Sequence, residues 1–163
     1  AYHHLALSKG GSIYHSNTGK GGRAMNRVLI IEDEKETAKA VKEALELEDI
    51  SADIALNGKE GLEKFRNESY DLILLDLKMP GLSGEDVLSE IRKEDPFIDV
   101  IIYTNYSNFA DVKKLVNIGI EGYINKGPSA DLSELIIAIK RRLEPLSEEA
   151  IGALLKDVPD TNE

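Results

Sequence analysis

Five polar side chains of this sequence follow short apolar runs, and their chemical types suit phosphoryl transfer. They are Glu32, Asp33, Asp76, Thr104 and Lys126. Carboxylates that lie close together raise one another's pKa unless a cation lies among them, and a hard ion with oxygen ligands such as Mg²⁺ fits best. A carboxylate beside Mg²⁺ and a lysine ammonium is a good phosphoryl acceptor, because both cations offset charge in the transition state. The Thr104 hydroxyl would bond a phosphoryl oxygen after transfer.

The apolar runs are the elements that must position these side chains. Residues 28–31, 72–75 and 100–103 are continuously apolar, as expected for strands that are covered on both faces. Residues 51–55 and 122–125 are weaker runs, and we predict that they are edge strands. The polar side chains then stand at carboxyl ends of strands, where a parallel sheet brings them to one rim.

Helix starts between the runs are marked by polar caps with an acidic residue three positions later. These pairs are Asn57 with Glu60, Ser83 with Asp86, Asn108 with Asp111, and Asp131 with Glu134. Apolar stripes typical of helices occur at Ala38, Val41 and Leu45, and at Leu132, Leu135, Ile136, Ile139 and Leu143. Five strands alternating with five helices require right-handed crossovers and a parallel sheet. We therefore predict an α/β fold, a doubly wound, flavodoxin-like (βα)5 domain whose ligands bind outside the carboxyl ends of the strands.

The regular pattern begins at Met25, and we predict one domain over residues 25–145. Residues 1–24 are rich in Gly, Ser, His and Asn, and we interpret them as an artificial leader or a disordered tag outside the fold. Residues 146–163 are predicted to hold a short extra C-terminal helix, capped at Ser147, and a polar tail.

The composition disfavours several classes of partner. The formal net charge of −10 makes nucleic acid an improbable direct partner. No apolar run approaches the ~18 residues of a membrane span, and the amino terminus lacks the apolar core of a signal peptide. We expect no membrane partner and a cytoplasmic location. The sequence contains no cysteine, so neither a disulfide framework nor a thiolate metal site is expected.

Four motifs carry the candidate residues. They are IIEDE at 30–34, LLDLKMPGLSG at 74–84, IIYTNYS at 101–107 and GYINKGPS at 122–129. Together they make the sequence resemble the response-regulator receiver domains of two-component systems, a family that includes the chemotaxis regulator. The resemblance covers about residues 26–143 and implies the same fold.

The resemblance implies a role for each residue of the acidic site. Glu32 and Asp33 would hold Mg²⁺, and Asp76 would be a metal ligand that is also phosphorylated. The backbone carbonyl of Lys78 would complete the protein ligands.

The resemblance also implies a switch. Lys126 would pair with the phosphoryl group, Thr104 would move toward it, and Tyr123 would turn inward. The donor would be a sensor histidine kinase, a phosphotransfer protein or a small phosphodonor. The surface would then bind a downstream effector protein or domain, or a second copy in a phosphorylation-dependent homodimer. On this interpretation the protein is not an enzyme, beyond any catalysis of its own phosphorylation and dephosphorylation.

Two alternative functions stay open. One is a receiver-like binding module that acts without phosphorylation, although such modules tend to lose an acid, the acceptor or the lysine. The other is an aspartyl-phosphate phosphatase of the haloacid-dehalogenase type, which would carry a second Asp where this sequence has Lys78. The lifetime of a phosphorylated form is left open by Lys78, by Asn105 and by Gly127, which replaces the usual proline of the family.

Overall fold

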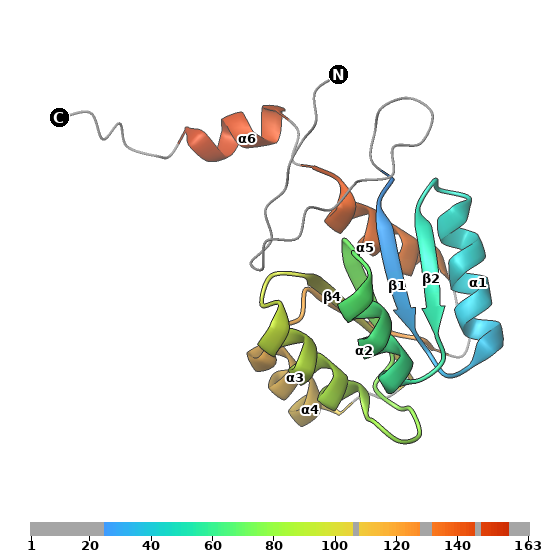
Figure 1. Cartoon of the computed structure of the whole chain (residues 1–163). Coiled ribbons are helices and arrows are strands. Elements are labelled where there is room, and N and C mark those ends of the chain that lie inside the picture. Colours follow the sequence, from blue (N-terminus) through green and yellow to red (C-terminus); the bar gives the residue numbers. More distant parts are fainter. Residues whose placement is uncertain (1–24, 106–107, 128–131, 146–147, 157–163) are drawn as a thin grey trace.

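The sheet of this computed structural model contains five parallel strands in the order β2-β1-β3-β4-β5. Figure 1 shows β1 and β2 side by side, next to α1. In chain order they are β1 (Arg27–Ile31), β2 (Ser51–Ala55), β3 (Leu72–Leu75), β4 (Asp99–Thr104) and β5 (Gly122–Asn125). The structure describes residues 25–105, 108–127, 132–145 and 148–156. The predicted strands and the doubly wound parallel sheet are confirmed, and β2 and β5 are its edge strands.

Helices alternate with the strands, and within the described residues they follow the predicted order. They are α1 (Lys35–Glu46), α2 (Gly58–Asn67), α3 (Gly84–Glu94), α4 (Phe109–Ile118), α5 (Leu132–Leu143) and α6 (Glu148–Leu155). The last of these is the predicted extra C-terminal helix.

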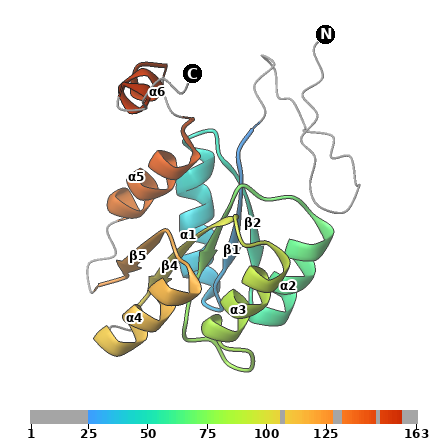
Figure 2. The ribbon, with the colours of Figure 1, turned by 90° about the vertical axis from the view of Figure 1, so that its left-hand side faces the viewer.

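Both faces of the sheet are covered by helices (Figure 2). On one face, α1 and α5 bury Ala38, Val41, Leu45, Leu135, Ile136 and Ile139. On the other face, α2, α3 and α4 bury Leu62, Val87, Leu88, Ile91 and Leu115. Because both faces are covered, β3 is buried along its length and β1 from Val28 onward, which explains their continuous apolar runs.

The winding direction of the sheet switches between β1 and β3. These strands pair in parallel with Ile31 opposite Leu75, while β2 lies on the outer side of β1 and β4 on the outer side of β3. The next residues along each strand, Glu32 and Asp76, therefore emerge side by side. In open α/β sheets, ligands bind in the crevice at this switch point.

The predicted N-caps Asn57, Ser83 and Asn108 begin α2, α3 and α4. The Asn57 and Ser83 side chains accept the backbone N–H of the third residue onward, at 2.8 and 3.2 Å. The Asn108 side chain instead accepts the N–H of Ala110 at 3.0 Å, and the third N–H bonds the Asn108 backbone carbonyl. The predicted cap Asp131 lies outside the described residues.

Several predictions about the two ends of the chain also lie outside the described residues. They concern residues 1–24, the cap Ser147 and the polar tail after Lys156. The division into a leader, a domain and a tail therefore stays a prediction. Within the part of the chain that the structure describes, no helix has the length and apolar character needed to span a membrane.

Gly84 allows α3 to begin directly against the loop that carries Asp76. A Cβ atom at Gly84 would lie 2.3 Å from the carbonyl oxygen of Asp76 and 2.6 Å from the Cα of Leu77. Both contacts are with backbone, which cannot move aside as a flexible side chain can. The N–H of Gly84 also donates to the Leu77 carbonyl at 3.1 Å. The close approach of helix and loop thus requires glycine at this position.

We predict that Gly84→Ala lowers the free energy of unfolding by about 1–3 kcal/mol, because the added methyl group overpacks a backbone contact. Urea unfolding followed by circular dichroism measures the effect. The control is Gly152→Ala in α6, where an added Cβ meets no atom within 4 Å and stability should not fall, because alanine favours a helix over glycine. Equal stability of Gly84→Ala and the unchanged protein would contradict the prediction.

Candidate functional site

Glu32 and Asp76 extend the ladders of β1 and β3 by one residue each. The N–H of Glu32 donates to the carbonyl of Ala55, and the N–H of Asp76 to that of Ile31, both at 3.0 Å. These bonds fix the backbone from which both side chains leave. The two residues are 3% and 6% exposed, which places two carboxyl groups in a nearly water-free position.

Asp33 completes a cluster of three carboxylates. One oxygen of each of Glu32, Asp33 and Asp76 lies within 4.8 Å of the others, and Asp33 is only partly buried. The backbone N–H of Lys78 donates to Asp76 Oδ1 at 3.3 Å, so the loop after β3 folds back over the acceptor carboxylate. Oxygen donors gathered at this separation suit a hard divalent cation.

Lys126 brings a cation to two of these carboxylates. Its ammonium forms ion pairs with Glu32 Oε2 and with Asp76 Oδ2, the latter at 3.2 Å. Its backbone N–H donates to the carbonyl of Thr104 at 2.9 Å, which extends the pairing of β4 and β5. Lys126 is itself 8% exposed, so the ion pairs are largely shielded from water.

Burial and charge shift the pKa of two groups in the site. Burial raises the pKa of Glu32 to about 7, and the neighbouring charge of Asp76 adds to the rise, against the opposing hydrogen bond from Lys126. Burial acts to lower the pKa of Lys126, but its bonds and attraction to Glu32 and Asp76 outweigh that effect and raise it. Lys126 is therefore a permanent cation at neutral pH.

Thr104 and Tyr123 lie in β4 and β5, the strands next to Lys126. Thr104 ends β4 and is fully buried. Tyr123 pairs with Ile102 and packs against the core that α2, α3 and α4 cover. Its side chain therefore lies on the face of the sheet opposite to that of Lys126. Its hydroxyl oxygen is buried. The Tyr123 hydroxyl thus points into the protein in this structure, and the role of Tyr123 as a switch stays a prediction.

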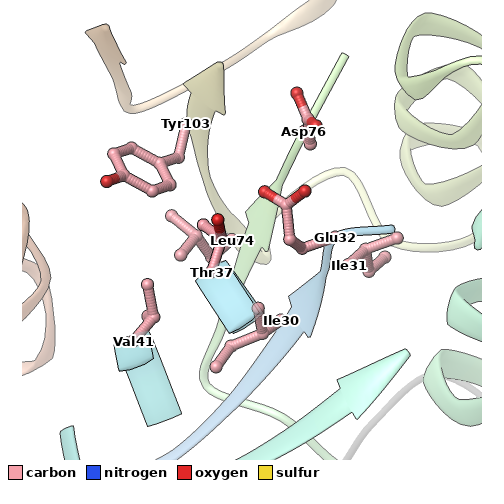
Figure 3. A pocket seen from close by; sticks show the side chains of 8 residues that line it. All are labelled: Ile30, Ile31, Glu32, Thr37, Val41, Leu74, Asp76 and Tyr103. Carbon is pink, nitrogen blue, oxygen red and sulfur yellow. The ribbon is translucent and has the colours of Figure 1, made fainter. Parts of the chain in front are cut away.

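Sequence reasoning overlooked Tyr103, the residue before Thr104. The Lys126 ammonium lies 5.5 Å from the centroid of its ring, and the residue is 4% exposed. Figure 3 shows the ring beside α1, at the space lined by Thr37 and Val41. The available signal was an aromatic residue at the end of an otherwise aliphatic strand.

The predicted site residues are therefore brought together in most respects. Glu32, Asp33, Asp76 and Lys126 form one connected cluster, with Thr104 joined to it through the backbone of Lys126. The Tyr123 side chain lies outside that cluster.

Comparison with known proteins identifies the family to which this arrangement belongs. The model of the response regulator receiver domain matches residues 28–140. The chain belongs to the response regulator receiver domain family. This confirms the resemblance that the four motifs carry, and the receiver domain accounts for all five strands of the sheet except the first residue of β1.

Relatives of this receiver domain are named as regulators. The response regulator ArlR of Staphylococcus saprophyticus is 37% identical over 119 residues, which cover 73% of this chain and 53% of ArlR. The transcriptional regulatory protein YkoG of Bacillus subtilis is 36% identical over 130 residues, which cover 78% of this chain and 56% of YkoG. The chain spans about half the length of these curated relatives.

The whole length of one solved response regulator matches this chain. The response regulator TrrA of Thermotoga maritima, crystallised in complex with Mg²⁺ and BeF, is 36% identical and superposes with a TM-score of 0.66. The match covers 73% of this chain and 100% of TrrA.

We predict that Lys126→Met lowers the free energy of unfolding by about 3 kcal/mol at pH 8, because two buried carboxylates lose their cation. The loss should be smaller at pH 6, since a carboxyl whose pKa is raised in the folded state binds a proton there and becomes neutral. Urea unfolding at both pH values measures it. Lys39→Met, on the exposed surface of α1, is the control and should change stability by less than ~0.5 kcal/mol. A pH-independent loss would contradict this account.

Proposed function

We propose that this receiver domain accepts a phosphoryl group on Asp76 and thereby changes which partner its surface binds. The observation that carries the proposal is the position of the Asp76 carboxylate. It is buried at the switch point of the sheet, one oxygen is paired with the Lys126 ammonium, and two further carboxylates stand within 4.8 Å. An anionic acceptor needs a cation such as the Lys126 ammonium beside it, and carboxylates that can hold a metal ion. Both are needed because negative charge builds up on the transferred group.

We propose Mg²⁺ as the cofactor of this reaction. The donors present are all oxygens, which fits a hard cation, and TrrA was crystallised with Mg²⁺. Glu32, Asp33, Asp76 and the backbone carbonyl of Lys78 would hold the ion. When bound, it would offset the charge of the carboxylates and of the phosphoryl oxygens.

The chemistry of transfer follows from the acceptor. A carboxylate oxygen of Asp76 attacks the phosphorus of the donor, an O–P bond forms, and the bond between phosphorus and the leaving group breaks. Acetyl phosphate releases acetate, whereas a phosphohistidine releases an imidazole whose nitrogen takes a proton from solvent. The product is an acyl phosphate on Asp76. Lys126, already protonated, stabilises the added negative charge.

We propose that the output is a change in binding. Thr104 would bond the phosphoryl group, and β4, β5 and the adjoining helices α4 and α5 would shift their preferred arrangement. This surface exposes large apolar side chains that a partner can cover: Phe109, Val116 and Ile137 are 86%, 59% and 50% exposed. The phosphoryl donor would be a histidine kinase or phosphotransfer protein. The partner that binds the changed surface would be an effector or a second copy of this chain.

The direct test is intact-mass spectrometry after incubation with acetyl phosphate. We expect one added phosphoryl group that requires Mg²⁺ and is lost in Asp76→Asn. The matched control is Asp71→Asn, which removes an aspartate just before the opposite end of β3 and should be labelled like the unchanged protein.

Labelling that persists in Asp76→Asn would reject Asp76 as the acceptor. No labelling of the unchanged protein, together with no binding of beryllium fluoride, would favour a binding module that acts without phosphorylation. Steady turnover of generic phosphate esters would favour a phosphatase.

A second prediction concerns the cation. Asp33→Asn should weaken Mg²⁺ binding at least tenfold, since loss of even an outer partner of a metal ligand costs about 10–100-fold. Isothermal titration calorimetry measures the dissociation constant. Glu36→Gln removes the same charge from the exposed first turn of α1 and controls for the loss of general electrostatic attraction. Equal affinities of the two variants would remove Asp33 from the metal site.

A further inference from the structure

We infer that Tyr103 is a positioning residue, whose ring holds the Lys126 ammonium in place for the reaction at Asp76. The inference rests on the proposed function, because it assigns a second residue to the site at which the phosphoryl group would arrive. Its starting point is the 5.5 Å separation between the ammonium nitrogen and the centroid of the ring. A cation at that distance is attracted to the negative face of an aromatic ring.

The strand register explains why these two side chains meet. Tyr103 of β4 is paired with Ile124 of β5. Side chains alternate between the faces of a strand, so Lys126, two residues after Ile124, leaves the chain on the same face as Tyr103. Ile124 and Tyr103 both pack with the core beneath α1 and α5, in agreement with this alternation.

The ring is held from several directions. Tyr103 borders a narrow space together with Thr37 and Val41 of α1 and Leu74 of β3 (Figure 3). Glu32 and Asp76 line the same space, so the ring and the carboxylates surround one small region of the site. With only 4% of its surface exposed, the Tyr103 side chain has little freedom to swing away.

The ion-pair partners of the Lys126 ammonium have a second task in the proposed reaction. Glu32 and Asp76 are its ion-pair partners, and both are carboxylates of the proposed metal cluster. Asp76 would moreover become an acyl phosphate. The uncharged face of Tyr103 is not an Mg²⁺ ligand, so this contact can persist while the carboxylates change partners. Burial strengthens it, since cation–π attraction grows when water is excluded.

The backbone after Lys126 adds to the need for such a support. Gly127 has a φ of +55° and is exposed, and an added Cβ there would meet no atom within 4 Å. The residue that follows Lys126 thus has no side chain that could pack and hold the loop in place. On the other side of Lys126, the edge strand β5 is only four residues long. Hydrogen bonds hold the backbone here, from the Lys126 N–H to Thr104 and from the Gly127 N–H to Asn125, and the ring of Tyr103 adds a contact at the far end of the Lys126 side chain.

The first arm of the experiment compares the rates of Mg²⁺-dependent labelling by acetyl phosphate, measured by intact-mass spectrometry. We expect Tyr103→Leu to lower the rate about tenfold, the scale of a desolvated cation–π contact, and Tyr103→Phe to retain nearly the full rate because it keeps the ring. The matched control is Tyr70→Leu. Tyr70 also carries a cation over its ring, with Arg27 at 5.0 Å, but it precedes β3 at the far end of the sheet.

The second arm measures the contact itself without any cofactor or phosphodonor. Urea unfolding in Mg²⁺-free buffer compares the unchanged protein, Tyr103→Leu, Lys126→Met and the double variant. If the ring acts on the ammonium, the two substitutions are non-additive, because either one alone removes the shared contact. Additive effects would mean that Tyr103 serves the core independently of Lys126.

The outcomes separate this inference from the proposed function. A labelled protein in which Tyr103→Leu reacts as fast as the original, or in which Tyr103→Phe is as slow as Tyr103→Leu, overturns the role of the ring alone. Additive unfolding free energies overturn it as well. A protein that takes up no phosphoryl group and binds no beryllium fluoride overturns the proposed function, and with it the role of Tyr103, even where the unfolding cycle shows coupling.

Discussion

Two buried carboxylates share one buried ammonium at the carboxyl edge of the sheet, and the rest of the structure is arranged around that ionic contact. Charges removed from water are costly unless opposite charges and hydrogen bonds are fixed around them. Glu32, Asp76 and Lys126 come from three different strand ends, separated by 44 and 50 residues in the sequence. The parallel sheet brings those ends together at one edge. Helices cover both faces of the sheet (Figure 2), and Gly84 lets α3 approach the acceptor loop closely.

Much of the fold and most of the candidate site could be predicted from local patterns. Strands covered on both faces are continuously apolar, so residues 72–75 could be assigned as a strand without knowledge of their neighbours. Parallel strands end at one edge, so Asp76 and Lys126 could be placed at the same edge of the sheet. The caps Asn57 and Ser83 could be predicted because each side chain accepts the backbone N–H of the residue three positions later, which is a local contact.

What could not be predicted depends on packing between distant elements. The contact of Tyr103 with Lys126 needs the register of β4 against β5, which no local pattern specifies. The inward packing of Tyr123 likewise depends on the core that surrounds it. The Asn108 side chain bonds a different N–H from the one expected, because a cap can satisfy either of two neighbouring donors within the first turn.

The last two residues of β4 connect the two helical layers of this domain. Tyr103 packs with the core beneath α1 and α5, whereas its predecessor Ile102 packs with the core beneath α2, α3 and α4, the face to which the alternation directs Thr104. A small displacement of this strand end therefore alters the packing of both layers at once. The sheet therefore couples the two helical layers mechanically. Sequence changes that adapt one layer to a new partner must remain compatible with the packing of the opposite layer.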